Sequence, residues 1–254
     1  AVILAVGLGF GAAGMVGGAL AGTVLTAVIA IWRTRDLWSL EGERFDGKNL
    51  LREILPLVFG FGACQFMFTS DTMFAKAFFG DNQMAQYAAA GTLSRALLWL
   101  VMPLAAVMFP KLVHANVRAE KTNLFFIVAL GTAALTLIGG LGLWIFGPLT
   151  IKIVYKSAYL GAAALIPWYA GAMVPLAMAN VMVNDLLARG RFRVVPWMVL
   201  LAVAYGLTLV WALHHFPGKM EVVLQTLAVF NALLLGVCAW FTWEKKIRSP
   251  KSEV

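Results

Sequence analysis

Long apolar stretches alternate with short polar connections along almost the whole chain. Most of the apolar stretches have about twenty residues or more, the length that a helix needs to cross the hydrocarbon core of a bilayer. The pattern predicts seven membrane-spanning helices, at residues 1–32, 51–79, 84–110, 122–147, 158–186, 194–213 and 222–243. We therefore expect an all-α, multi-pass membrane protein.

The polar segments divide these predicted helices unevenly. Residues 33–50 form the longest connection and place Trp and Leu beside charged residues, which predicts an amphipathic cytoplasmic linker. One helix (1–32) precedes this linker, and six (51–243) follow it. This arrangement predicts that 1–32 is the last helix of a truncated N-terminal lobe and that 51–243 form a six-helix C-terminal lobe. Residues 244–254 are predicted to be a basic, disordered cytoplasmic tail.

Composition and charge agree with a membrane protein. Hydrophobic residues make up 61% of the chain and charged residues 13%, about half the charged share of a soluble domain. The net charge of +8 is scattered among short connections, which excludes nucleic acid as the expected partner and favours membrane lipids. Because Lys and Arg mark cytoplasmic loops, we predict that the connections at 33–50, 111–121 and 187–193 and the tail are cytoplasmic, and that those at 80–83, 148–157 and 214–220 are outside.

The sequence lacks the signatures of the common enzyme classes. It has no GxSxG, HExxH, P-loop or glycine-rich nucleotide motif, and its three His lie in connections without an acidic or Cys cluster. A membrane enzyme acting on a lipid carrier would show acidic clusters at a loop mouth, whereas Asp81 stands alone on its turn. We therefore predict that the protein is not an enzyme and that it holds no metal and no cofactor.

The first hairpin of the predicted C-terminal lobe carries three charged residues within its apolar runs: Asp71, Lys76 and Arg95. At about 1.5 Å of helical rise per residue, Asp71 and Arg95 lie roughly 17 and 20 Å from the turn at 80–83. Their similar depth predicts that they pair. Ionisable groups at membrane depth are costly and face a bundle interior or a water-filled cavity.

Two interpretations of these charges remain open. Asp71 and Arg95 could be a structural ion pair that fixes the register of two helices. Alternatively, Arg95, with Lys76 nearer the outer end, presents positive charge to an anionic phosphate or diphosphate, a task that suits the planar donor fork of Arg. Asp71 would then neutralise Arg95 while the cavity is empty. Lys76 is also close enough to the interface to extend its ammonium group into water.

Other polar residues within the predicted spans allow similar alternatives. Gln65 and Asn180 are typical of interhelical hydrogen bonds, but on facing helices they would also suit a sugar-binding cavity. We take Arg95, Asp71, Lys76, Gln65 and Asn180 together as the candidate substrate-binding residues. Near the cytoplasmic end of its span, Asp185 is expected to cap the helix or to meet the arginines at 189–193.

The run from Asp71 to Arg95 has the pattern D-x-x-x-x-K-x-F-x-G-D-x-Q-x-A-x-Y-A-A-A-x-x-L-x-R, and P-L-A-A-V-M-F-P-K follows at 103–111. These motifs resemble the start of the C-terminal half of polysaccharide flippases, which transport O-antigen and other lipid-linked oligosaccharides. Those flippases belong to the multidrug/oligosaccharidyl-lipid/polysaccharide exporter superfamily.

The resemblance implies two six-helix lobes around a central cavity and transport by alternating access. The implied substrate is a polyprenyl-diphosphate-linked glycan, moved across the bacterial inner membrane. A multidrug exporter of the same superfamily, a flippase for a peptidoglycan lipid precursor and a membrane scaffold without transport activity remain alternatives.

Overall fold

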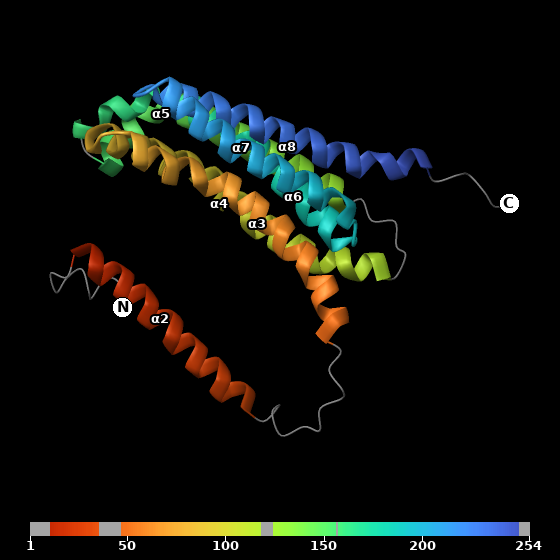
Figure 1. The fold of residues 1–254 in the computed structure, drawn as a ribbon. Coiled ribbons are helices and arrows are strands. Elements are labelled where there is room, and N and C mark those ends of the chain that lie inside the picture. The colour runs from red at the N-terminus through yellow and green to blue at the C-terminus, as the bar shows by residue number, and fades with distance from the viewer. Residues whose placement is uncertain (1–10, 36–46, 118–123, 156, 249–254) are drawn as a thin grey trace. The chain divides into compact units, whose positions relative to one another are not determined.

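The computed structural model describes residues 11–35, 47–117, 124–155 and 157–248 of the chain. All regular secondary structure in these ranges is helical, which confirms the predicted all-α class for the described part of the protein (Figure 1). The α-helices are α2 (Gly11–Thr34), α3 (Gly47–Phe78), α4 (Asp81–Val117), α5 (Leu124–Tyr155), α6 (Ile166–Ala188), α7 (Val195–His215) and α8 (Met220–Arg248). Two 3₁₀ helices, η2 (Ser157–Ala164) and η3 (Phe192–Val194), precede α6 and α7.

Six helices of the described ranges are long and apolar enough to cross a membrane, which is the build of a multi-pass membrane protein. They are α2, α3, α5, α6, α8 and the η3–α7 segment. The predicted count of seven is not confirmed, because α4, where the third span was expected, is not among the six.

The chain divides into two compact units, residues 1–50 and 51–254. In the first unit, no residue of the apolar span Val16–Thr34 of α2 is buried, and residues such as Val16, Leu20 and Trp32 are more than half exposed. A helix that is apolar on all sides requires lipid or other helices around it. The division falls at the predicted start of the six-helix lobe, but the assignment of the two units to two lobes stays a prediction.

In the second unit, α3 to α8 run alongside one another as a bundle (Figure 1). The central helix is α6, because 61% of its apolar span is buried, against 17–39% in α3, α5, η3–α7 and α8. It packs against α4, α5 and α8, and small buried residues such as Ala172 and Ala179 allow this close approach. Asn231 on α8 donates a 2.8 Å hydrogen bond to the backbone carbonyl of Ala172, which joins α6 to α8.

Several predicted boundaries are wrong. The connection expected at 148–157 is largely helical, because α5 continues through Pro148 to Tyr155 and η2 follows it. Proline removes a single helical hydrogen bond, and an unbroken helix keeps the remaining backbone groups satisfied in an apolar environment. Likewise, α4 continues beyond Pro110 to Val117.

The turn of the first hairpin is shorter than predicted. Only Phe79 and Gly80 separate α3 from α4, which begins at Asp81, where a negative charge favours the positive end of the helix dipole. The tail was predicted to be disordered from 244, but α8 extends to Arg248. Residues 1–10, most of the predicted linker (36–46) and the chain end (249–254) lie outside the described residues.

Candidate functional site

Asp71 on α3 and Arg95 on α4 form the predicted ion pair, with 2.6 Å between Arg95 Nη2 and Asp71 Oδ1. The Asp71 side chain is fully buried, and that of Arg95 is 13% exposed. Measured from the turn between the two helices, the backbone of Arg95 lies deeper in the bundle than the backbone of Asp71. Helical side chains lean toward the N-terminus of their own helix, and the N-terminus of α4 is at the turn. The Arg95 side chain therefore extends toward the turn and reaches Asp71.

Two tyrosines that sequence reasoning missed complete the surroundings of Asp71. Its Oδ2 accepts a 2.8 Å hydrogen bond from the hydroxyl of Tyr87 on α4 and a second from the hydroxyl of Tyr169 on α6. Both rings are completely buried and lie tilted against each other, with centroids 5.4 Å apart. The carboxylate therefore has three donors from two neighbouring helices, and a buried charge requires such partners to be tolerated.

Arg95 is held on several sides. Its Nη2 also donates to Thr72 Oγ1 at 2.6 Å, and its guanidinium lies 5.3 Å from the ring centroid of Phe68 and 5.5 Å from that of Tyr169. Both rings can stabilise the cation through their π faces. The Nε–H is buried and has no hydrogen-bond partner among the described residues. Arg95 thus keeps donor capacity that its present contacts do not use.

A cleft of about 540 Å³, the polar cleft, adjoins this cluster; three amide side chains give it its polar groups, and most of the rest of its lining is apolar. Its walls come from α3, α4 and α6, and its lining residues are Phe61, Gly62, Cys64, Gln65, Phe68, Leu98, Met102, Leu176, Asn180 and Asn184. The structure therefore brings the candidate residues Gln65 and Asn180 to one cavity and adds Asn184 to them. Phe68 belongs to both features, because it lines the cleft and also lies against the guanidinium of Arg95. The volume is in the usual range for a small-molecule pocket, about 300–1,000 Å³.

Lys76 lies apart from the other candidate residues. Its side chain is 62% exposed and donates a 2.8 Å hydrogen bond to Asp81 at the start of α4. Asp81 is therefore paired with a cation, because the short turn brings the start of α4 next to the last turn of α3. The hydrogen bond and the positive charge of Lys76 hold the pKa of Asp81 below its usual value.

The expected contact at the other end of α6 is also present. Arg189 Nε donates to Asp185 Oδ1 at 2.8 Å, one helical turn away, which confirms the predicted meeting of Asp185 with the arginines that follow it. Arg191 donates to the backbone carbonyls of Phe241 and Thr242 at 3.1 and 3.2 Å. The Arg191 contacts join the α6–α7 connection to α8. Two of the three arginines at 189–193 therefore have partners within the protein, so no bound ligand is needed to explain their presence.

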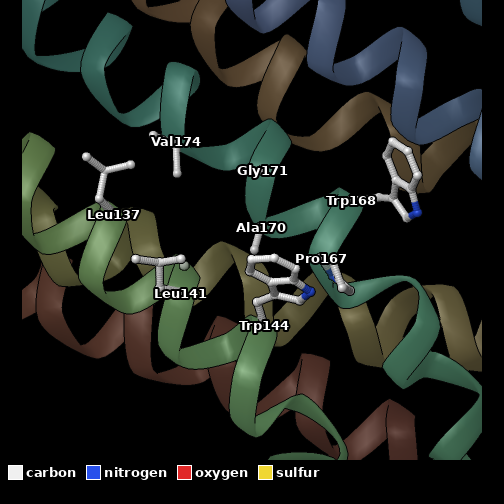
Figure 2. Close-up of a pocket in the computed structure, with 9 residues that line it drawn as sticks. Leu137, Leu141, Trp144, Pro167, Trp168, Ala170, Gly171 and Val174 are labelled. Carbon is white, nitrogen blue, oxygen red and sulfur yellow. The ribbon is translucent and has the colours of Figure 1, made fainter.

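A second hollow, of about 600 Å³, lies between α5 and α6. Figure 2 shows Leu137 and Leu141 along α5, Ala170 and Val174 along α6, and the ring of Trp144 beside Ala170. Apart from the Trp indole N–H groups, its side chains are apolar, and it opens on the outside of the bundle. Although this hollow is larger than the polar cleft, its side chains could contact an apolar ligand but could form few hydrogen bonds with it.

Together, these features define a multi-pass helical membrane protein with a buried Asp–Arg–Tyr cluster next to a polar cleft. Within the described ranges, no three His, Cys, Asp or Glu side chains gather in an arrangement that could hold a metal ion. Comparison with known proteins gives no closer assignment: no family model, no curated protein and no solved structure matches this chain.

Proposed function

We propose that this chain is part of a flippase that moves polyprenyl-diphosphate-linked oligosaccharides across the bacterial inner membrane by alternating access. The observation that carries the proposal is the position of Arg95, a cation within the apolar bundle, beside a polar cleft and with an unused donor. The resemblance of the motif between Asp71 and Arg95 to polysaccharide flippases supports the same function. The surrounding lipids and an N-terminal lobe are the partners that this proposal requires.

The chemistry of Arg95 suits a diphosphate group. A guanidinium presents several N–H donors in a planar fork that matches phosphate oxygens and stays charged at every physiological pH. For Arg95 to reach a diphosphate, its bond to Asp71 must loosen or be shared. The hydroxyls of Tyr87 and Tyr169 would continue to donate to Asp71 in that state, so that the buried carboxylate keeps two partners.

The alternative of a multidrug exporter needs an acidic group that meets cationic drugs. Asp71 is the candidate acid at membrane depth in the first hairpin, but it is fully buried and accepts three hydrogen bonds. This environment supports the flippase over the drug exporter. A peptidoglycan lipid precursor also carries a diphosphate, so the same site chemistry would serve that substrate.

A transport assay in proteoliposomes tests the proposal. The complete protein is reconstituted with fluorescent polyprenyl-diphosphate-linked oligosaccharide, and movement of the label between leaflets is measured. We expect transport in the parent protein, loss of transport in Arg95→Ala, and normal transport in Lys152→Ala, which removes an exposed Lys from α5. Unchanged transport in Arg95→Ala would overturn the role of Arg95.

A second variant separates loss of function from loss of folding. In Asp71→Asn/Arg95→Gln both charges are removed, so no unpaired charge remains buried. If this variant folds but does not transport, the charged pair is needed for transport and not only for folding. If it transports normally, the ion pair is a structural brace. Parallel assays with a peptidoglycan precursor and with a cationic dye distinguish the three substrate classes.

A further inference from the structure

The polar side chains that line the cleft in the described part of the chain are uncharged. They are the three amides Gln65, Asn180 and Asn184, and no Asp, Glu, Lys, Arg or His is among the described lining residues. Gln65 projects from α3, and the two Asn project from α6, so the amides stand on two walls. An ionic ligand group placed among them would lose its hydration without gaining a counter-charge, which is strongly unfavourable. The lining therefore favours neutral polar groups.

Much of the hydrogen-bonding capacity of these amides is free. Asn184 Nδ2 donates to the backbone carbonyl and to Oδ1 of Asn180, at 2.8 Å each. Among the described residues, the amide N–H₂ of Asn180 and the whole amide of Gln65 make no hydrogen bond. A side-chain amide both donates and accepts. It is therefore matched to hydroxyl and acetamido groups, which also donate and accept.

The lining also contains two aromatic rings, Phe61 and Phe68, both on α3. Aromatic rings beside amides are the combination that binds sugars, because the ring packs on the apolar C–H face of a pyranose while the amides meet its hydroxyls. Phe68 lines the cleft, and its ring centroid lies 5.3 Å from the guanidinium carbon of Arg95. A ligand with a sugar in the cleft would therefore have its anionic group near Arg95.

We propose that the cleft formed by Gln65, Asn180, Asn184, Phe61 and Phe68 binds an uncharged sugar residue of the transported glycan. This inference rests on the proposed flippase function and adds a substrate class to it. The sugars nearest the diphosphate are neutral hexoses or N-acetylated hexosamines, and uronic or sialic acids are disfavoured at this position.

Binding measurements on the complete protein in nanodiscs test the inference. Three probes are compared: a polyprenyl diphosphate with a neutral disaccharide, the same lipid with a uronic acid as its first sugar, and the sugar-free polyprenyl diphosphate. We expect the neutral glycolipid to bind about tenfold more tightly than either other probe, the size of one or two neutral hydrogen bonds.

Variants assign this preference to the cleft. Asn180→Leu and Gln65→Leu are expected to remove the tenfold preference while leaving the affinity for the sugar-free lipid unchanged. Gln225→Leu, which removes an exposed amide from α8 outside the cleft, is the matched control and should retain the preference. Retained exclusion of thiol reagents from the buried Cys238, with Cys64 replaced by Ala, verifies that each variant is folded.

The possible failures are distinguishable. Equal affinity for the neutral and the sugar-free lipid, or a preference that persists in Asn180→Leu and Gln65→Leu, overturns the sugar site and leaves the flippase proposal standing. Preferred binding of the uronic acid probe overturns the neutral class. Absence of binding by all three probes, together with absence of transport, overturns both proposals.

Discussion

Replacement of Arg95 by Leu provides the sharpest test of how the buried cluster is held together. The substitution removes the 2.6 Å contact with Asp71, the bond to Thr72 and the cation–π contacts with Phe68 and Tyr169. It leaves a carboxylate with no exposed surface and with only two hydroxyl donors. We predict that Arg95→Leu is strongly destabilising and that a second change, Asp71→Asn, restores much of the loss.

The magnitude follows from the burial and the remaining donors. Breaking a buried ion pair by removing one partner costs about 3–5 kcal/mol. We expect about 3 kcal/mol, the lower end, because the hydroxyls of Tyr87 and Tyr169 still solvate Asp71. In Asp71→Asn/Arg95→Leu the buried charge is gone and an amide oxygen remains as acceptor for both hydroxyls. We therefore expect the double variant to recover about 2 kcal/mol.

A buried cysteine supplies the assay. Cys238 is free and completely buried, so a thiol-reactive fluorophore labels it only when the protein unfolds; Cys64, which lines the cleft, is replaced by Ala in every variant. At about 2–4 °C per kcal/mol for a domain of this size, Arg95→Leu should lower the midpoint of thermal unfolding in detergent by about 6–12 °C. Lys76→Leu is the control, because its pair with Asp81 is exposed and should leave the midpoint unchanged.

One result would refute the reasoning. If Asp71→Asn/Arg95→Leu is no more stable than Arg95→Leu, the destabilisation does not come from an unpaired buried charge. The loss would then come from packing around the aliphatic part of Arg95, and the cluster would have no electrostatic role in stability.

Two further predictions concern packing and topology. Gly91→Ala should lower the midpoint of thermal unfolding, because the added Cβ would lie 3.1 Å from ring atoms of Tyr169 and push the Tyr169 hydroxyl away from Asp71. Gly142→Ala is the control, since the space around its added Cβ is open and the midpoint should not fall. An impermeant maleimide applied to intact spheroplasts should label Lys219→Cys and should not label Arg193→Cys. The reason is that both positions are exposed and the positive-inside rule places Lys219 outside and Arg193 in the cytoplasm. The reverse labelling pattern would contradict the predicted orientation.

The pairing of Asp71 with Arg95 could be predicted from the sequence because it depends on few variables. Helical rise gives the approximate depth of each residue on its side of a turn, and the long Arg side chain covers the difference in depth that the shorter turn leaves between them. Opposite charges within a membrane have a strong reason to meet. Tyr87 could also have been found, since it lies eight residues before Arg95 and therefore on nearly the same face of α4. Tyr169 could not, because α6 approaches α3 only through the tertiary fold.

Helix boundaries were harder to predict for a physical reason. Proline and glycine end helices in water, where freed backbone groups find solvent, but within a bundle the unbroken helix is the cheaper structure. Pro148 and Pro110 therefore lie inside α5 and α4 and do not end them. The polar cleft was predicted only in outline, because Gln65 and Asn180 gave no sign of which helices would face each other.

The geometry also changes the choice between a brace and a substrate contact. A brace between α3 and α4 needs only the bond between Asp71 and Arg95. The donation by Tyr87 and Tyr169 to the other carboxylate oxygen adds partners that do not depend on Arg95. A carboxylate with such independent donors can tolerate a temporary loss of its Arg, and an Arg with an unused Nε–H can gain an anionic partner. If the protein is the flippase proposed above, the contacts that stabilise the resting cluster would also lower the cost of moving Arg95 toward a diphosphate, and the structural and the functional interpretations would describe two states of one site.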